Sequence, residues 1–366
     1  MDFTLPALTA FIITVVATPL TIRLAKKFGL VDDPKTRPHP AHLHQVTIPR
    51  AGGLAIYLGL VSTILFFLPL DKHLAGILAG LTLLLIAGLI DDKLPNFNPY
   101  LRLFLTFLAA MLAVGSGIGI SFITNPLAHF PNLPTFLSGS IIHLDQPHLT
   151  VNLLGQHNIA IIADILALFW IVALTQIVNW SKGVDGQMPG ITTVAAIILG
   201  LLSLKFYWQG DPNQLMVAKL AFIVAGVSLA FLIFNWHPAK IFPGFSGSTI
   251  LAYILAILAI LSGAKLATAL LVLAVPAVDF VYTFWRRLLA GKSPVWGDRG
   301  HLHHKLVDLG WSHQKISLFY ITGSAMLGAI ALAVGTESKI FTAVLVVVIF
   351  TGFVLWFNSL GDLSKP

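Results

Sequence analysis

The chain of 366 residues contains no cysteine, and charged residues make up only 10% of it. The absence of cysteine excludes disulfides, thiolate nucleophiles and cysteine metal sites. Soluble domains carry about a quarter charged residues. With 57% hydrophobic residues, this chain cannot cover a water-facing surface, so lipid must be its main solvent.

The few charges are unbalanced, with a net charge of +7. In a membrane protein this excess indicates orientation and contact with anionic headgroups or anionic substrates, and not nucleic-acid binding. No small-residue cleavage pattern follows the first apolar stretch, residues 3–24, so we expect a first span there and not a signal peptide. No internal repeat is visible.

Apolar runs that can cross a bilayer, which takes about 20 residues, occur eleven times along the chain. They cover residues 3–24, 51–70, 74–90, 101–121, 158–178, 191–205, 216–234, 246–263, 265–284, 316–335 and 339–357. The sequence therefore predicts an all-α polytopic membrane protein of about eleven transmembrane helices. We expect a single domain, residues 1–366.

Lys and Arg predict the orientation of these spans. If the eleven spans alternate, one side of the membrane collects 17 of the 22 Lys and Arg residues. Because basic loops stay in the cytoplasm, we expect the N-terminus outside and the C-terminus inside. Segment 122–157 has no Lys or Arg and becomes an extracytoplasmic loop, in which the alternating stretches 141–144 and 149–153 indicate a β-hairpin.

Two loops on the basic side begin with charges beside apolar runs. Arg50 precedes a glycine pair, and Asp91-Asp92 directly follows a long apolar run. Adjacent carboxylates at a membrane boundary are costly unless they are paired, solvated or metal-bound. They suit Mg²⁺ with a phosphate, or removal of a proton. An ordinary positive-inside loop and a solvated helix end would show the same residues.

The next two loops place polar residues among glycines. Asn179, Lys182 and Asp185 end a span, which indicates either a broken helix facing a polar cavity or a simple turn. After Asn235, Ser246 and Ser248 open the following span. Free N–H groups at such a helix start bind anions, whereas ordinary capping by the serines is the alternative.

Segment 285–315 is the longest and most basic loop, and it is rich in histidine. Arg299, His301, His303 and His304 lie close together in it. Such histidines either bind a metal or donate hydrogen bonds to phosphates. Together, the loops put carboxylates, cations and glycine-rich helix starts on one face of the membrane, the equipment for handling a diphosphate beside a lipid.

Taken in order, these motifs resemble the polyprenyl-phosphate N-acetylhexosamine-1-phosphate transferases, or glycosyltransferase family 4, which include undecaprenyl-phosphate GlcNAc-1-phosphate transferase and phospho-N-acetylmuramoyl-pentapeptide transferase. The motifs are Pro49-Arg50-x-Gly52-Gly53, Asp91-Asp92, Asn179-x-x-x-Gly183-x-Asp185-Gly186, Asn235-x-x-Pro238-Ala239, Gly244-x-Ser246-Gly247-Ser248 and Asp298-Arg299-x-His301-Leu302-His303-His304. The ordered set is specific, although each motif alone is weak.

The resemblance implies transfer of a sugar 1-phosphate from a UDP-N-acetylhexosamine to undecaprenyl or another polyprenyl phosphate, with release of UMP, in cell-wall or surface-glycan biosynthesis. It implies Mg²⁺ as the cofactor and an active site on the cytoplasmic face of the plasma membrane. It leaves open whether the chain is a monomer or a homodimer. Asp91, Asp92 and Asp185 become the candidate catalytic residues and magnesium ligands.

By the same resemblance, Asp91 and Asp92 serve the lipid phosphate, whereas Asn179 and Asp185 line the nucleotide pocket. We expect Asp279 to stabilise the last loop. The candidate substrate-binding residues are Arg50, Asn179, Lys182, Asn235, Ser246, Ser248, Arg299, His301, His303 and His304.

Two positions depart from the family pattern. Lys182 and Phe245 stand where the family has aspartates, the second of them a principal magnesium ligand. This exchange shifts the local charge by about three units, so the site should hold Mg²⁺ less well and a bare diphosphate better. Either Lys182 replaces part of the metal's charge, or Asp91, Asp92 and Asp185 still bind Mg²⁺.

Two other functions remain as alternatives. The first is a non-catalytic relative that binds polyprenyl phosphate or a nucleotide sugar. The second, which is less favoured, is a transporter. A transporter would show an internal repeat and polar residues near the middle of the membrane. Only Asp164 and Asp279 are acidic residues well inside the predicted spans.

Overall fold

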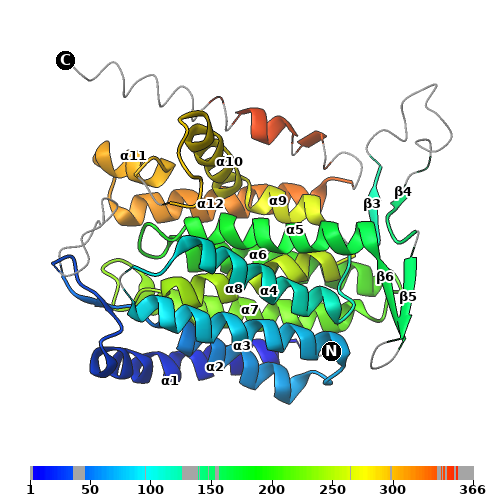
Figure 1. Ribbon diagram of the computed structural model, residues 1–366, viewed down its shortest axis with the longest axis horizontal. Helices are drawn as coiled ribbons and strands as arrows, with labels where there is room; N and C mark the ends of the chain where they lie inside the picture. Colours follow the sequence, from blue (N-terminus) through cyan, green and yellow to red (C-terminus); the bar gives the residue numbers. More distant parts are fainter. Residues whose placement is uncertain are drawn as a thin grey trace.

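The helices of the chain lie side by side in a bundle, and most of them run along its long axis (Figure 1). The computed structural model describes residues 3–35, 46–94, 96–125, 139, 141–146, 148–152, 156–263, 265–296, 299–335, 339, 341–342, 344–349 and 352. The helices are α1 (Thr4–Phe28), α2 (Gly52–Phe67), α3 (Lys72–Lys93), α4 (Pro99–Gly115), α5 (Ile161–Trp180), α6 (Gln187–Trp208), α7 (Gln214–Asn235), α8 (Gly244–Leu261), α9 (Leu266–Val272), α10 (Ala274–Leu289), α11 (Leu302–Asp308) and α12 (His313–Ala333).

Seven of these helices are long and apolar enough to cross a membrane: α1, α3, α5, α6, α7, α8 and α12. The pair α9 and α10 adds an eighth if it counts as one span, and α2 and α4 are shorter apolar helices. The prediction of a polytopic helical membrane protein is confirmed. The count of eleven stays a prediction, because part of the expected last span, 339–357, lies outside the described residues.

One expected span is not straight. Residues 265–284 were predicted to cross as a single helix, but α9 and α10 meet at an angle of 86°. Pro276 in the first turn of α10 has no N–H and cannot donate to the carbonyl four residues earlier, which interrupts the helix at this point. As a result, α10 lies across the long axis of the bundle (Figure 1).

Short strands form three separate antiparallel pairs. They are β1 (Val31–Asp32) with β2 (Ile48–Pro49), β3 (Phe122–Thr124) with β4 (Ile141–His143), and β5 (His148–Asn152) with β6 (Gln156–Ala160). The two alternating stretches of segment 122–157 therefore pair with other strands and not with each other. Strands β3 to β6 lie at the end of the bundle opposite α11 (Figure 1).

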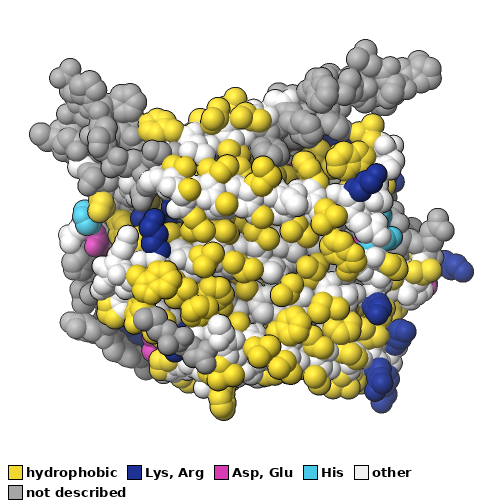
Figure 2. Space-filling view, turned by 180° about the vertical axis from the view of Figure 1, so that it is seen from behind, with side chains coloured by type: hydrophobic (Ala, Val, Ile, Leu, Met, Phe, Trp, Pro, Cys, Tyr) yellow, Lys and Arg dark blue, Asp and Glu magenta, His cyan; other side chains and the backbone are white. Residues whose placement is uncertain are grey.

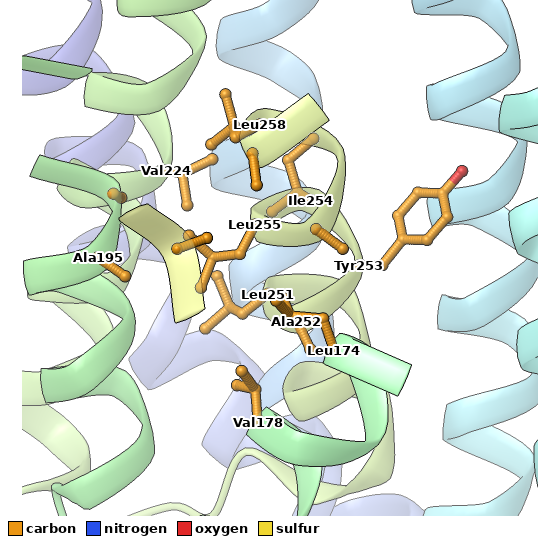
Figure 3. Packing of buried hydrophobic residues seen from close by; sticks show 14 of the residues in the cluster. Leu174, Val178, Ala195, Val224, Leu251, Ala252, Tyr253, Ile254, Leu255 and Leu258 are labelled. Carbon is orange, nitrogen blue, oxygen red and sulfur yellow. The ribbon is translucent and has the colours of Figure 1, made fainter. Parts of the chain in front are cut away.

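Helix α8 is the centre of the bundle. Its residues from Gly244 to Ile260 are all buried, and it packs against α2, α3, α5, α6 and α7. Figure 3 shows Leu255 among side chains of α5, α6 and α7, whereas Tyr253 points the other way. There its hydroxyl donates to the carbonyl of Ala109 on α4, over 3.2 Å. This packing fixes the position of the start of α8.

The outer surface has the pattern of a lipid-facing protein. Hydrophobic side chains cover the middle of the bundle, and Lys and Arg gather towards its two ends (Figure 2). Phe66, for example, is 81% exposed. Large apolar side chains on such a surface are favourably solvated by hydrocarbon, whereas their exposure to water would cost free energy.

Candidate functional site

The start of α8 is held by Asp92 at the end of α3. The carboxylate accepts hydrogen bonds from the backbone N–H groups of Phe245 (2.7 Å) and Ser246 (3.2 Å), and from the Ser246 hydroxyl (2.6 Å). A Cβ at Gly244, whose φ is +69°, would lie 2.3 Å from Asp92 Oδ2. Glycine is required there, and Asp92 caps a helix start that would otherwise attract an external anion.

Two arginines neutralise the aspartate pair. The Nε of Arg50 donates to Asp92 Oδ1 (3.2 Å), and its Nη2 lies 3.6 Å from Asp91 Oδ2. The Nε of Arg102, a residue that the sequence did not single out, donates to Asp91 Oδ1. Burial alone would lower the pKa of Arg50, but the negative charges of Asp92, Asp32 and Asp91 raise it above its ordinary value.

Lys182 lies beside this cluster, in the loop between α5 and α6. Its Nζ donates to Asn179 Oδ1 (2.7 Å), to the Ser248 hydroxyl (3.0 Å) and to the carbonyl of Gly244 (3.3 Å). Burial, and then the positive charge of Arg50, lower the pKa of Lys182 to about 7. An ammonium with all three protons directed at oxygen atoms therefore stands next to the start of α8.

Phe245 lies between two of these cations. Its side chain is buried, and its ring centroid lies 5.5 Å from Lys182 Nζ and 5.6 Å from the guanidinium carbon of Arg102. An aromatic face attracts a cation at this range. The residue at the expected metal-ligand position thus contacts positive charges through its ring.

The residues of this cluster do not fit Mg²⁺. This ion is coordinated octahedrally by oxygen atoms, one or two of them from carboxylates. Both oxygens of Asp92 and Oδ1 of Asp91 already accept hydrogen bonds. Asp91 Oδ2 has no hydrogen-bond partner, but it faces Arg50. Arg50, Arg102 and Lys182 thus face Asp91, Asp92 and, 3.8 Å from Arg50, Asp32. The carboxylates are already matched by cations, which leaves little negative charge for a divalent cation.

Asp185, the third expected ligand, belongs to a different cluster. Its Oδ2 accepts from His237 Nδ1 (2.7 Å) and from the backbone N–H of Ala239 (3.2 Å), and His313 Nδ1 lies 3.7 Å away. None of its described contacts reaches Asp91 or Asp92. Burial pushes the pKa of Asp185 up, but the interactions with His313, His237 and Ala239 bring it below its ordinary value.

Asn235 connects two of the loops. Its Oδ1 accepts from the backbone N–H of Gly186 (3.0 Å), and its Nδ2 donates to the carbonyl of Ile241 (2.9 Å). The side chain is buried. Both ends of the amide are engaged with backbone, so Asn235 fixes the loop after α5 against the loop after α7.

The last loop is anchored by Asp279 of α10. This carboxylate pairs with His301 Nδ1 (2.9 Å) and accepts from the backbone N–H of Leu302 (2.7 Å), which agrees with the stabilising role expected for it. The Arg287 guanidinium lies over the Trp180 ring, 4.7 Å from its centroid. These contacts attach α11 to the ends of α5 and α10.

His303 and His304 lie inside this anchored loop. Both are buried, and neither Nδ1 has a hydrogen-bond partner. A Cβ at Gly183 would lie 2.0 Å from His303 Nε2, so a glycine is needed for the close approach. Burial lowers the pKa of His303 well below its ordinary value and that of His304 to about 4. Both are neutral near pH 7, so each can donate a hydrogen bond to a phosphate but adds no charge.

The sequence-predicted residues thus fall into three groups near one end of the bundle. The group at the start of α8 holds Arg50, Asp91, Asp92, Asn179, Lys182, Ser246 and Ser248, with Phe245. Asp185 and Asn235 form the second group, and the three histidines form the third. Arg299 stands apart, because it is exposed and pairs with Asp308 (2.8 Å). Sequence reasoning missed Arg102, His237 and His313, and the partner of the two histidines, Asp185, is remote from them in the chain.

These features define a polytopic helical membrane protein with a cation-rich cluster where helix ends meet. Comparison with known proteins gives the family: the sequence model for glycosyl transferase family 4 matches residues 74–263, and the chain belongs to this family. The matched region contains both aspartates of α3 and the starts of α6 and α8.

Two relatives cover most of both sequences. The chain is 30% identical to the decaprenyl-phosphate N-acetylglucosaminephosphotransferase of Mycolicibacterium smegmatis, over 93% of this chain and 82% of the relative. It is 26% identical to the undecaprenyl-phosphate alpha-N-acetylglucosaminyl 1-phosphate transferase of Escherichia coli O157:H7, over 91% and 84% respectively.

Proposed function

We propose that the chain transfers N-acetylhexosamine 1-phosphate from a UDP-sugar to a polyprenyl phosphate and releases UMP. An oxygen of the lipid phosphate attacks the β-phosphorus of the UDP-sugar. A new P–O bond forms as the bond between this phosphorus and the UMP oxygen breaks, and UMP leaves. The observation that carries the proposal is the cluster of Arg50, Arg102 and Lys182, set around Asp91 and Asp92 beside the start of α8.

Phosphoryl transfer of this kind depends mostly on positioning and on neutralising charge. Lys182 is suited to neutralising charge, because its longest hydrogen bond, 3.3 Å to the Gly244 carbonyl, can be replaced by one to a phosphate oxygen. A phosphate monoester has a second pKa of about 6, so the lipid phosphate reaches the site already ionised near pH 7. Asp91 and Asp92 then hold the cations in place and need not act as bases.

In this proposal Lys182 takes over part of the charge that a magnesium ion would supply. The side chains at the start of α8 favour this, since Phe245 offers no ligand atom and the aspartates are already paired. In this proposal the site faces the cytoplasm, where nucleotide sugars are found, and the excess of Lys and Arg in the loops that carry it supports this side. Cell-wall or surface-glycan synthesis is the corresponding role.

The experiment uses the full chain purified in detergent, UDP-GlcNAc and UDP-GalNAc as donors, and undecaprenyl phosphate as acceptor. UMP is measured with Mg²⁺, with EDTA, and after EDTA with Mg²⁺ restored. UMP that persists in EDTA supports the role of Lys182. UMP that appears only with Mg²⁺ keeps the transferase function and excludes the lysine as the metal's substitute.

A second candidate is a relative that binds the same ligands without reaction. It is favoured by the buried ring of Phe245 and by the saturated hydrogen bonds of Lys182, because both make the cluster complete without substrate. This function predicts that a UDP-sugar or polyprenyl phosphate binds, whereas no UMP appears from the donors under any metal condition.

A further inference from the structure

Three side chains from distant parts of the chain meet beside the loop that follows α5. Asp185 lies in that loop, His237 in the loop after α7, and His313 is the first residue of α12. One ligand atom from each lies within 4.8 Å of the other two. We propose that Asp185, His237 and His313 form a binding site for a divalent transition metal of the Zn²⁺ type, separate from the cluster at the start of α8.

The distances fit such an ion after a small adjustment. Zinc bound at about 2.0–2.1 Å with tetrahedral geometry holds its ligand atoms roughly 3.3 Å apart. In the structure, Asp185 Oδ2 lies 2.7 Å from His237 Nδ1 and 3.7 Å from His313 Nδ1. The first pair must therefore open and the second close by a few tenths of an ångström, and the ligand atoms of His237 and His313 lie within 4.8 Å of each other. Two imidazoles and one carboxylate are an established zinc ligand set that leaves a fourth position open.

The surroundings of the three residues also point to a missing ligand. His313 Nδ1 is buried without a hydrogen-bond partner, an arrangement that costs free energy. A metal ion would give this nitrogen a partner. Asp185 is already fixed by the N–H of Ala239 at its carboxylate and by the Ser317 hydroxyl at its backbone carbonyl (2.5 Å). Such outer contacts orient metal ligands.

Zinc is favoured over magnesium at this position by the chemistry of the donors. Imidazole nitrogen suits Zn²⁺, Co²⁺ and Ni²⁺, whereas Mg²⁺ prefers an all-oxygen shell. No guanidinium or ammonium group is in described contact with Asp185, in contrast to Asp92. Within the part of the chain that the structure describes, this is the only group of three His, Asp or Glu side chains that converges in this way.

A bound ion would cross-link the loop after α5, the loop after α7 and the start of α12. The same loop carries Lys182, three residues before Asp185, so the ion would also hold the loop that brings the ammonium to the start of α8. The open fourth position would take water or an oxygen atom of a ligand. The site does not depend on the transferase function, because the three side chains converge without any substrate.

The experiment measures zinc binding to the full chain in detergent, freed of any affinity tag, stripped with a chelator and without nucleotide. We expect about one Zn²⁺ per chain by titration calorimetry. Co²⁺ in its place should give the visible absorption of a tetrahedral site with nitrogen and oxygen ligands. A protein that binds no Zn²⁺ under these conditions, or gives an octahedral Co²⁺ spectrum, overturns the proposal.

Variants assign the site. His313→Gln and His237→Gln should each lose the bound equivalent, and Asp185→Asn should weaken it, with gel filtration showing that each variant stays folded. His304→Gln removes a buried histidine of the neighbouring cluster, and this variant should still bind one Zn²⁺. Zinc binding that survives His313→Gln and His237→Gln, or that is lost in His304→Gln, places the metal elsewhere and excludes this site.

Discussion

Asp92 at the end of α3 and Asp185 in the loop after α5 are both largely buried carboxylates, but their partners differ in kind. Asp92 is bound by Arg50 and by the N–H groups at the start of α8. Asp185 is bound by His237, by the N–H of Ala239 and, at a longer distance, by His313. The first environment is built of positive charge, and the second of imidazoles.

The difference decides which carboxylate can exchange its partners. A guanidinium stays charged in proteins, so Asp92 and Arg50 remain paired under all ordinary conditions. An imidazole gives up its proton readily and then presents a lone pair to a metal. The ion pair of Asp92 at the start of α8 is therefore permanent, whereas in the proposed metal site the Asp185 cluster changes from a hydrogen-bonded state to a metal-bound one.

The largest expected effect follows from Asp92→Asn. The variant leaves Arg50 without its closest counter-charge and weakens the cap of α8 at the centre of the bundle, and breaking such a buried pair costs about 3–5 kcal/mol. We expect a strong fall in the melting temperature and no UMP release. Asp185→Asn should cost less, about 1–3 kcal/mol, because no permanent charge is left unpaired.

Thermal unfolding in detergent, followed by circular dichroism, compares the two variants directly. Equal losses of stability for Asp92→Asn and Asp185→Asn would contradict the distinction between the two carboxylates. A stable Asp92→Asn variant that still releases UMP would remove Asp92 from the proposed site.

The next effect concerns the identity of the cation in the site. Lys182→Met should lower UMP release by about 10²–10³-fold, the loss typical when one charge-stabilising group is removed. The double variant Lys182→Asp, Phe245→Asp adds two carboxylates and should gain Mg²⁺ binding, measured by calorimetry. If Lys182→Met keeps full activity, the ammonium is not the group that replaces the metal.

The pH dependence of Lys182 gives two effects of opposite sign. Since burial lowers its pKa from 10.5 to about 7, the unfolded chain binds a proton between pH 7 and 10.5 that the folded chain does not. The free energy of unfolding should therefore rise with pH across this window. Binding of inorganic diphosphate needs the ammonium and should weaken about tenfold per pH unit above 7.

Titrations of diphosphate between pH 6 and 9 measure the second effect. Lys182→Arg keeps its charge and should bind with little change over this range, so it is the matched control. Affinity that is independent of pH in the unmodified chain would show that Lys182 does not contact the anion.

The cluster at the start of α8 could be predicted in large part from the sequence, because its signals are local. Asp91-Asp92 after a long apolar run and serines at a span's start mark positions where charge must be compensated. Arg102 and His313 carry no such signal. Arg102 reaches Asp91 across a turn between two helices, and His313 reaches Asp185 from 128 residues further along the chain, so only the packing of the helices brings them together.

The break between α9 and α10 shows another limit of hydropathy. Residues 265–284 are apolar throughout, so their composition predicts a span but not its path. Pro276 was the available signal, since a proline ends the hydrogen-bonding pattern of the preceding turn. Segment 122–157 shows a related limit: alternation identifies strands, whereas the register and the choice of partner depend on contacts that the pattern does not contain.

The smallest effect should come from Phe245→Leu. Leucine keeps a buried apolar side chain beside the start of α8 but removes the aromatic face that Lys182 and Arg102 contact, and each such contact contributes about 0.5–2 kcal/mol. We expect a few-fold weaker binding of inorganic diphosphate at pH 7, measured by calorimetry, and a loss of stability of about 1 kcal/mol, the lower end for two such contacts. Phe245→Tyr retains the ring and should bind as the unmodified chain does. Equal affinities for Phe245→Leu and Phe245→Tyr would mean that Phe245 only fills space, and that the hydrogen bonds of Lys182 and the ion pairs of Arg102 suffice to hold these cations in the cluster.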